Sequence, residues 1–346
     1  TEGWDGGTTN QYGCVNIVNP IVAVGEDGAQ SSIAYSLDGY NWSVIGKHIF
    51  ETNGWYVAYN GSMWVAVGEG NEDTIAYSYD GMNWIGLGKT IFTTRGLALG
   101  WNGSYWIAGG RGTNQLAISY DGITWTGVSQ TVFTTQVRKL CWTGTQWIAL
   151  GEGTNRIGTS PDGINWTARG NGLFNSGGAI DVASNGLIHV GVGDGASHRI
   201  SYSYDGITWN AAQTSDGSST STLFTTDVYA VATNGKMWVV AGRGSNTMGY
   251  SYDGITWYGA GQPIAQRGYG VCWNGRYWVA VGRGAPKVVI SYDGINWLAM
   301  PNTGSVPFVL QGLGVNSLVR VINEGGYNKE FVLGKYGHGL SNTMVV

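Results

Sequence analysis

Charged residues are scarce in this chain. Asp, Glu, Lys and Arg make up 12% of its 346 residues, where about 25% is ordinary, and the formal net charge is only −4. Binding to nucleic acid relies on clusters of Lys and Arg that contact phosphates, and the sequence has no such cluster. No apolar run approaches the roughly 18 residues of a membrane span. We therefore expect neither a nucleic-acid partner nor insertion into a membrane.

Cysteine and histidine are also few, which argues against a metal site. The cysteines lie far apart, each in or beside an apolar segment, so we interpret them as small buried side chains; they are Cys14, Cys141 and Cys272. A zinc site needs Cys or His at short spacing, whereas the histidines are scattered. We expect no metal and no cofactor, and we expect His189 and His198 to lie at the surface.

Glycine is abundant by contrast, and the chain repeats itself. Its 59 glycines are about 17% of the residues against a usual 7% or so, which indicates many tight turns. The heptapeptide Ser-Tyr-Asp-Gly-Ile-Thr-Trp at residues 251–257, or a close copy, occurs seven times at intervals of 40 to 48 residues. This period is typical of a four-stranded propeller blade. The aspartates of the seven copies are Asp38, Asp80, Asp121, Asp162, Asp205, Asp253 and Asp293.

Each heptapeptide is expected to form a turn between two strands. Ser and Asp side chains bond the backbone of tight turns, Gly supplies a φ angle that other residues avoid, and Trp begins the next strand. Burial of one Trp side chain stabilises by roughly 2 to 3 kcal/mol, so these residues would fasten neighbouring sheets. The tryptophans are Trp42, Trp84, Trp125, Trp166, Trp209, Trp257 and Trp297.

The heptapeptide resembles the Asp-box (BNR-like) element of sialidases and many other propellers, Ser-x-Asp-x-Gly-x-x-Trp, which lies between the third and fourth strands of a blade. It departs from that pattern by one residue, because Gly follows Asp directly. The whole repeat, as in Val-Cys-Trp-Asn-Gly-Arg-Tyr-Trp-Val-Ala-Val-Gly at 271–282, is similar to tandem propeller repeats in large DNA viruses, phages and environmental bacteria. It is more distantly similar to the propeller of the photosystem II assembly factor. The resemblance implies the fold but not the function, since such boxes occur in enzymes, lectins and scaffolds.

Strand positions follow from turn signals. In the second repeat, residues 56–59 and 64–67 read as strands across an Asn60-Gly61 turn, a strong hairpin signal, and 75–78 reads as the third strand before the heptapeptide. We expect an all-β fold of four-stranded antiparallel blades.

The number of blades is less directly given. We expect a single domain over residues 1–346 with eight blades, of which the last is degenerate and lacks the heptapeptide. The alternative is seven blades with a C-terminal appendage. The expected blades span about 14–46, 54–88, 96–128, 137–169, 179–212, 228–259, 268–299 and 308–346.

A propeller separates its loops into two faces. The first-to-second and third-to-fourth strand turns share one face, here called the turn face, and the remaining loops share the other, the connector face. On the connector face one position beside glycine changes charge from blade to blade, which predicts a ring of mixed sign that binds a ligand. The structural alternative is solubilising turn residues or ion pairs worth about 0 to 1 kcal/mol each. The ring residues are Glu26, Glu69, Arg111, Glu152, Asp194, Arg243, Arg283 and Glu324.

Aromatic residues near these loops are interpreted as packing residues. Phe92, Phe133 and Phe224 of the connectors are expected to anchor between blades. The tyrosines of the heptapeptides would suit stacking on sugars, but repeated Tyr in strands is ordinarily packing. The long Ser/Thr/Gly connector at 214–222 is expected to be the most mobile loop.

Nothing in the sequence assembles a catalytic site. The sialidase resemblance implies three arginines around a carboxylate, a Tyr/Glu nucleophile pair and an acidic proton donor, and no such set can be assigned. A glycosidase needs two carboxylates at a defined separation, whereas most candidates are repeated turn residues. We expect no catalytic residue and no enzyme activity.

The function that remains is binding. We expect a binding or structural propeller, displayed extracellularly or on a virion or phage, that engages a glycan or a protein surface through the connector face. Three alternatives stay open. They are a multivalent lectin with sugar sites between blades, a sialidase-like glycoside hydrolase, and a self-assembling subunit joined through residues 300–346.

Overall fold

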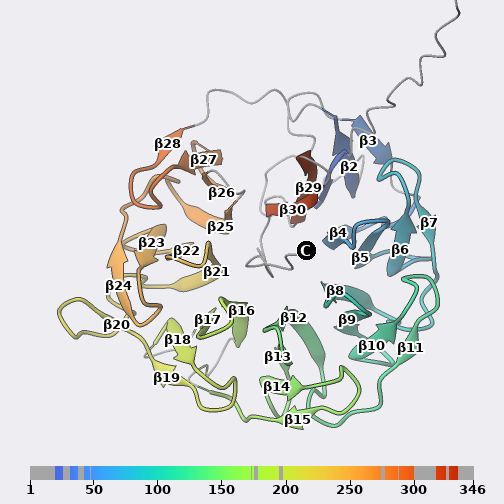
Figure 1. The fold of residues 1–346 in the computed structure, drawn as a ribbon, viewed down its shortest axis with the longest axis horizontal. Coiled ribbons are helices and arrows are strands. Elements are labelled where there is room, and N and C mark those ends of the chain that lie inside the picture. The colour runs from blue at the N-terminus through green and yellow to red at the C-terminus, as the bar shows by residue number, and fades with distance from the viewer. Residues whose placement is uncertain are drawn as a thin grey trace, which may run out of the picture.

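The computed structural model describes most of the chain, and that part is built of β-strands. The described residues are 20–25, 32–37, 43–46, 48–172, 174, 178–194, 198–273, 277–286, 288–299, 317–324 and 327–333. They form seven sheets arranged around one axis (Figure 1). The described part contains no helix, and so none that is long and apolar enough to cross a membrane.

Each of blades two to seven is an antiparallel meander that runs from the axis outward. Blades two to four comprise β4 (Asn53–Tyr59), β5 (Trp64–Glu69), β6 (Ile75–Ser78), β7 (Ile85–Gly86), β8 (Arg95–Trp101), β9 (Trp106–Arg111), β10 (Leu116–Ser119), β11 (Thr126–Gly127), β12 (Gln136–Trp142), β13 (Trp147–Glu152), β14 (Ile157–Ser160) and β15 (Thr167–Ala168). Blades five to seven comprise β16 (Ala179–Ser184), β17 (His189–Gly193), β18 (Ile200–Ser203), β19 (Asn210–Ala211), β20 (Gln213–Thr214), β21 (Asp227–Thr233), β22 (Trp238–Arg243), β23 (Met248–Ser251), β24 (Thr256–Gly259), β25 (Arg267–Trp273), β26 (Trp278–Arg283), β27 (Val288–Ser291) and β28 (Leu298–Ala299).

The first blade shows how the ring closes. Its sheet has the order β3 (Ser43–Gly46), β2 (Ile33–Ser36), β1 (Ile21–Val24), β29 (Ser317–Glu324) and β30 (Tyr327–Leu333). The C-terminal strand β29 therefore supplies the inner partner of the N-terminal strand β1, with Val22 opposite Val319. The fold is a seven-bladed β-propeller.

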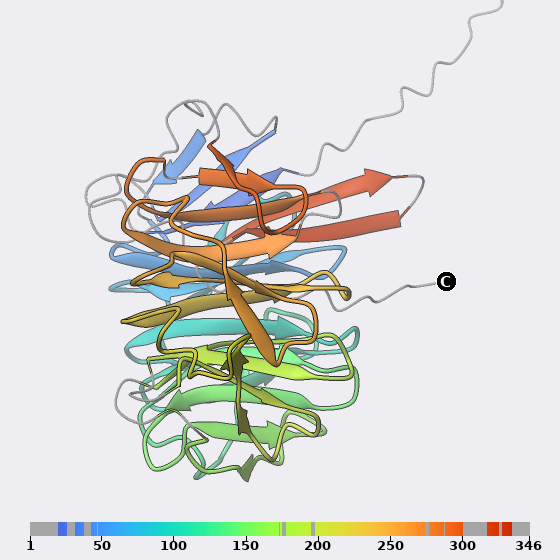
Figure 2. The same cartoon turned by 90° about the vertical axis from the view of Figure 1, so that its left-hand side faces the viewer.

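The eighth blade expected at 308–346 is not formed within the described residues. Its two strands add to blade one, so the alternative of seven blades fits. The prediction of an eighth blade relied on the distance in sequence from the seventh heptapeptide to β29. That distance is the same whether β29 is the first strand of a new blade or the missing innermost strand of blade one. The hairpin of β29 and β30 continues past the end of β1 and projects from one side of the ring (Figure 2).

The heptapeptides form the expected turns in all six described copies. In blade six, Asp253 Oδ1 accepts hydrogen bonds from the N–H groups of Ile255 at 2.8 Å and Thr256 at 2.7 Å, and from Ser251 Oγ at 2.9 Å. Gly254 has a φ of +78°, which L side chains avoid. The turn is thus held by its own side chains. Asp38 and Trp42 of the first copy lie outside the described residues.

Each heptapeptide glycine also fastens its blade to the preceding one. A Cβ on Gly122 of blade three would lie 2.9 Å from Met63 Sδ of blade two, and a Cβ on Gly163 of blade four would lie 2.5 Å from Ile107 Cδ1 of blade three. Only glycine allows this close approach at a positive φ. The turn therefore couples neighbouring blades through backbone contact as well as through its Trp.

The tryptophans that fill the core are mainly a second set. Heptapeptide residues Trp84 and Trp257 are buried, whereas the other described copies are half-buried, and five of the indoles donate back to the glycine carbonyl of their own turn. The indoles at the start of the second strands are at most 1% exposed: Trp64, Trp106, Trp147, Trp238 and Trp278. Of the six described heptapeptide tryptophans, two are thus buried as expected, and the second-strand tryptophans fill the rest of the core.

Two loop predictions concern the connectors between blades. Phe92, Phe133 and Phe224 of the connectors are at most 1% exposed, which confirms that they are anchors. The connector at 214–222 is hydrogen-bonded to blade six, because β20 pairs in parallel with β24 on the outer edge of that sheet. Asp216, which accepts the Thr214 hydroxyl and the Ser218 N–H, holds its turn.

Candidate binding surface on the connector face

The predicted ring positions lie where the second strand of each blade ends. Glu69, Arg111, Glu152, Arg243 and Arg283 each pair in register with the first residue of the innermost strand of the same blade. These ends share the connector face, so the position of the ring follows the prediction. Asp194 comes directly after β17, and Glu26 lies outside the described residues.

Glu324 does not belong to this ring. It is the last residue of β29 and pairs with Tyr327, whereas the prediction placed it in a connector-face turn of an eighth blade. Arg320 is opposite Ile21, the residue of β1 that lies toward the turn face, and the chain continues for four residues beyond that point. Glu324 therefore projects on the side opposite to the ring.

Two residues of the predicted ring, Glu69 and Glu152, are joined into one polar network across three blades. Arg95 Nη1 lies 3.6 Å from Glu69 Oε2, and its Nη2 donates to Gln136 Oε1 at 3.2 Å. Gln136 Nε2 in turn donates to Glu152 Oε2 at 2.7 Å, and Glu152 pairs with Arg138. The four charged side chains are only 25 to 31% exposed, so this is a partly desolvated array.

The sequence prediction missed the residues that connect this array. Arg95 and Gln136 begin the innermost strands, and Arg138 is the extra residue of a β-bulge in β12. These positions lie in segments that were interpreted only as apolar inner strands. The signal was present, because the first residue of the innermost strand is polar in five of six blades: Asn53, Arg95, Gln136, Asp227 and Arg267.

A second polar cluster joins blades six and seven. Tyr229 and Tyr269 are the extra residues of the bulges in β21 and β25, and their ring centroids are 5.3 Å apart. The Tyr229 hydroxyl donates to Asp227 Oδ2 at 2.8 Å, and Arg267 Nη1 lies 3.5 Å from the Tyr269 hydroxyl. Trp55, over which Arg95 stacks at 5.9 Å, and Tyr229 are partly exposed and give the face aromatic surfaces beside guanidinium groups. Tyr269 is only 4% exposed and packs against Tyr229.

Two blades place like charges directly opposite each other at this face. Arg95 is opposite Arg111, and Arg267 is opposite Arg283. Directly opposed like charges destabilise a strand pair. Arg95 is compensated by Glu69, whereas among the described residues no carboxylate forms an ion pair with Arg267 or Arg283. In the described part of blade seven, these two arginines therefore lie without an ion-pair partner, with Asp227 of blade six in the same polar cluster as Arg267.

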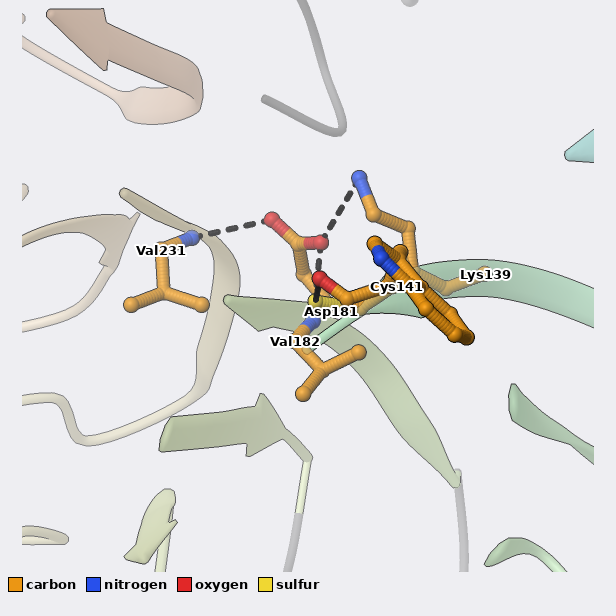
Figure 3. Close-up of polar contacts among 6 residues, drawn as sticks. Lys139, Cys141, Asp181, Val182 and Val231 are labelled. Carbon is orange, nitrogen blue, oxygen red and sulfur yellow. Dashed lines mark hydrogen bonds and ion pairs between the residues drawn. The ribbon is translucent and has the colours of Figure 1, made fainter. Parts of the chain in front are cut away.

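Beneath the face lies a buried ion pair. Lys139 Nζ of β12 is 2.9 Å from Asp181 Oδ1 of β16, and both side chains are 0% exposed. Asp181 also accepts the N–H of Val182 at 2.8 Å and the N–H of Val231 in blade six at 3.0 Å. Figure 3 shows the carboxylate between these groups. Asp181 thus ties together blades four, five and six.

The ion pair belongs to a packed layer around the axis. Lys139 Nζ lies 5.3 Å from the ring centroid of Tyr56 in blade two, and Tyr56 shares one hydrophobic cluster with Ile180 and Tyr229 of blades five and six. Side chains of non-adjacent blades therefore meet at this level. The polar groups of the connector face therefore lie above a buried, packed layer of side chains.

Tyr229 and Cys141 both keep their protons near neutral pH. Burial and the neighbouring Asp227 raise the pKa of Tyr229, so its phenol stays protonated near neutral pH. Burial raises the pKa of the Cys141 thiol to about 12. Glu69 and Glu152 are held by arginines. Within the part of the chain that the structure describes, no group of three or more His, Cys, Asp or Glu side chains is arranged to hold a metal ion.

One histidine was misplaced by the sequence prediction. His189, expected at the surface, is 4% exposed and begins β17, where five other blades have a buried Trp. Its Nδ1 lies 2.8 Å from Ser184 Oγ. Burial lowers the pKa of His189 to about 4, so the imidazole is neutral at physiological pH. It is a core residue of blade five.

Comparisons with known proteins identify the fold. No family model and no curated sequence matches the chain. Among solved structures, it is similar to the GH74 enzyme of Niastella koreensis, with a TM-score of 0.55 and 16% identity over 88% of this chain and 46% of that one. It is similar to YCF48 bound to D1 peptide, with a TM-score of 0.56 and 14% identity over 82% and 89%. It is also similar to the extracellular domain of a one-component system of B. thetaiotaomicron, with a TM-score of 0.57 and 9% identity over 92% and 39%.

These likenesses concern the propeller architecture. The chain spans less than half the length of the GH74 enzyme and of the B. thetaiotaomicron domain, while it spans most of YCF48. The neighbours include a glycoside hydrolase, a peptide-bound protein and part of a sensor. The function must therefore be argued from the site of this chain.

Proposed function

We propose that the protein is a non-catalytic binding propeller that holds an acidic segment of a partner protein on its connector face. The observation that carries this proposal is that Arg267 and Arg283 lie opposite each other and that neither forms an ion pair with a described carboxylate. An anionic group placed between the two guanidinium groups would relieve their repulsion. The bound partner would then neutralise the positive charge of Arg267 and Arg283 on this face.

The chemistry of the face suits carboxylates held in a defined orientation. A guanidinium group presents a planar fork of donors that matches a carboxylate in bidentate geometry. Arg111 and Arg243, both exposed, belong to the same ring, so several forks are available around it. Trp55 and Tyr229, both partly exposed, supply apolar surface of the kind that anchors interfaces. An extended segment with alternating acidic and apolar residues fits this combination.

Hydrolysis is less well supported by the same groups. A glycoside hydrolase needs two carboxylates flanking the scissile bond, one with a raised pKa, and Glu69 and Glu152 are instead each paired with an arginine. The GH74 neighbour shares only the fold at 16% identity. The YCF48 neighbour was solved with a peptide, which illustrates that a propeller of similar length can hold one.

The proposal includes the location of the protein on the exterior of a cell or virion. A surface rich in Gly, Thr and Asn with little charge suits display on the exterior of a cell or virion, where a repeat protein engages other surface molecules. Self-association through the C-terminal segment is the competing structural role. Light scattering of the full chain, which would reveal large assemblies at micromolar concentration, separates that role from binding of a partner.

The experiment compares a fluorescent peptide of alternating Glu and Leu with a matched peptide of Gln and Leu. We expect the acidic peptide to bind at least about tenfold more tightly, and R267A/R283A to remove that preference, because a bidentate charged contact is worth roughly 1.5 to 3 kcal/mol. The control is K236A, an exposed charge in the Asn-Gly turn of blade six on the opposite face. Equal affinity for both peptides, or equal effects of the two variants, would overturn the proposal.

A further inference from the structure

The tyrosines of the heptapeptides are exposed, contrary to the expectation that they pack. They are 60 to 69% exposed and lie on the turn face of five blades. A large aromatic side chain left in water contributes little to folding, and repeated exposure of such groups indicates a binding surface. The five residues are Tyr79, Tyr120, Tyr204, Tyr252 and Tyr292.

Each exposed tyrosine is held by one aromatic neighbour. In blades two, five and six, the neighbour is the tyrosine two positions earlier in the third strand, with ring centroids 5.7 to 5.8 Å apart. In blades three and seven, that strand position is Ile118 or Ile290, and the neighbour is instead Tyr105 or Tyr277 from the turn before the second strand, at 5.9 and 5.7 Å. The same pair is therefore built in two different ways.

Blade four shows that the fold does not require the pair. Pro161 replaces the exposed tyrosine there, and both neighbour positions, Gln146 and Thr159, are also without an aromatic ring. Its heptapeptide turn is nonetheless formed, with Asp162 Oδ1 accepting the N–H of Asn165 at 2.7 Å. In every described blade with the exposed tyrosine a supporting ring is present, whereas blade one has Tyr35 at the supporting position but Leu37 in place of the exposed ring. The exposed tyrosine therefore always acts together with a supporting ring.

The geometry of the unit favours a flat, uncharged ligand. One supporting ring leaves the exposed ring open to solvent, so the pair is a platform and not a cage around a cation. Beside the platform stand hydrogen-bonding side chains of the same turn, such as Asp80 and Asn83 in blade two, whose Oδ2 and Nδ2 are 2.7 Å apart. An aromatic surface bordered by amide and carboxylate groups matches the apolar C–H face and the hydroxyl groups of a pyranose.

We propose that the turn face is a multivalent binding surface for chains of neutral sugars, with one tyrosine platform on each of blades two, three, five, six and seven. This site is separate from the acidic-segment site on the connector face and uses none of its residues. Because the platforms repeat with the blades, a repeating polysaccharide engages several of them at once. The resulting affinity is then set by avidity more than by any single contact.

The test is affinity electrophoresis in gels that contain dextran, mannan, laminarin or galactan. We expect retardation by at least one of these neutral polysaccharides. The fivefold variant Y79A/Y120A/Y204A/Y252A/Y292A should lose at least about tenfold in apparent affinity, whereas single variants should lose only a few-fold, as expected for multivalent binding. The matching fivefold Tyr→Trp variant should keep the retardation. Because the substituted side chains are exposed, we expect all variants to retain the wild-type melting temperature.

Blade four provides a gain-of-function arm. The variant T159Y/P161Y builds the missing pair and should increase the retardation. R267A/R283A should leave the retardation unchanged, so failure of the connector-face proposal is distinguishable from failure of this one. Absence of retardation by all four polysaccharides would overturn the inference, as would retardation that the fivefold Ala variant does not change. Tyrosine-dependent binding of oligoproline or choline in place of the polysaccharides would also overturn it.

Discussion

The buried pair of Lys139 and Asp181 makes the strongest stability prediction, through the variant K139M. Methionine is similar in length and apolar, so it fills the space of the lysine stem against Tyr56. It leaves the Asp181 carboxylate at 0% exposure without its counter-ion, though still with the N–H groups of Val182 and Val231. Removal of one partner of a buried pair costs about 3 to 5 kcal/mol.

The cost of K139M should depend on pH in a defined direction. Burial already raises the pKa of Asp181 to about 6 from an ordinary 3.8, and Lys139 opposes that rise; without Lys139 the pKa rises further. The folded variant then binds a proton that the unfolded chain does not, so its stability increases as the pH falls. Protonating a carboxyl group of ordinary pKa costs about 5 kcal/mol at pH 7.5 and about 1.6 kcal/mol at pH 5.0. The penalty should therefore fall to roughly 2 kcal/mol at pH 5.0.

Urea unfolding at the two pH values measures both effects. The matched control is K139M/D181N, in which the single amide oxygen can accept one of the two N–H bonds and carries no charge. We expect this double variant to unfold within about 2 kcal/mol of the wild type, because replacing both partners removes the uncompensated charge. A K139M penalty below 1 kcal/mol at pH 7.5, or one that does not change with pH, would refute the idea that this pair is a desolvated ionic link.

Three further predictions concern the folding of the ring. G122A should lower stability by about 1 to 3 kcal/mol in thermal unfolding, since Gly122 has a φ of +76° and its Cβ would meet Met63 at 2.9 Å; S104A on an exposed turn is the control. Removal of residues 317–346 should abolish the single cooperative unfolding transition of the full chain and promote aggregation, because β1 loses its inner partner. A truncated chain that unfolds with the native transition would contradict closure of the ring by β29. Protonation of His189 should destabilise the fold as the pH falls from 6.5 toward about 4, by up to about 3 kcal/mol; H189Q should remove that part of the pH dependence, and an unchanged profile would contradict it.

The sequence predicted local structure well because each signal acts within a few residues. An Asn-Gly pair between apolar runs or a Ser-x-Asp-Gly turn is satisfied by its own side chains, as the bonds of Asp253 show. Ring closure was not predictable in this way. Whether Leu318 begins a new blade or lies opposite Ala23 depends on the number of blades that closes the ring, and that number is a property of the whole assembly.

The same contrast applies to the site residues. Glu69 and Glu152 were found because they vary at a turn, but Arg95 and Gln136, which join them, lie in strands whose alternation reads as buried. His189 was predicted to lie at the surface because its own strand was read alone. An alignment of the repeats shows that the equivalent position in other blades is a buried Trp, which reveals that the imidazole occupies a core position. Comparing repeats column by column, and not reading each strand alone, would have identified both features.

The two faces differ in a way that matches the ligands proposed for them. On the turn face, the same tyrosine unit recurs on five blades and is rebuilt from another position where Ile118 or Ile290 interrupts it, so the face repeats with the symmetry of the ring. On the connector face, the equivalent positions carry Glu69, Arg111 and Arg243, and no two adjacent blades from two to five present the same side chain there. A repeating ligand gains from identical sites because each further contact is intramolecular. A single partner of defined sequence gains from sites that differ, because charges of unlike sign then fix its register and reject other partners. The two proposed sites share no residue, so we expect occupation of one by a polymer to leave the other free for a specific protein.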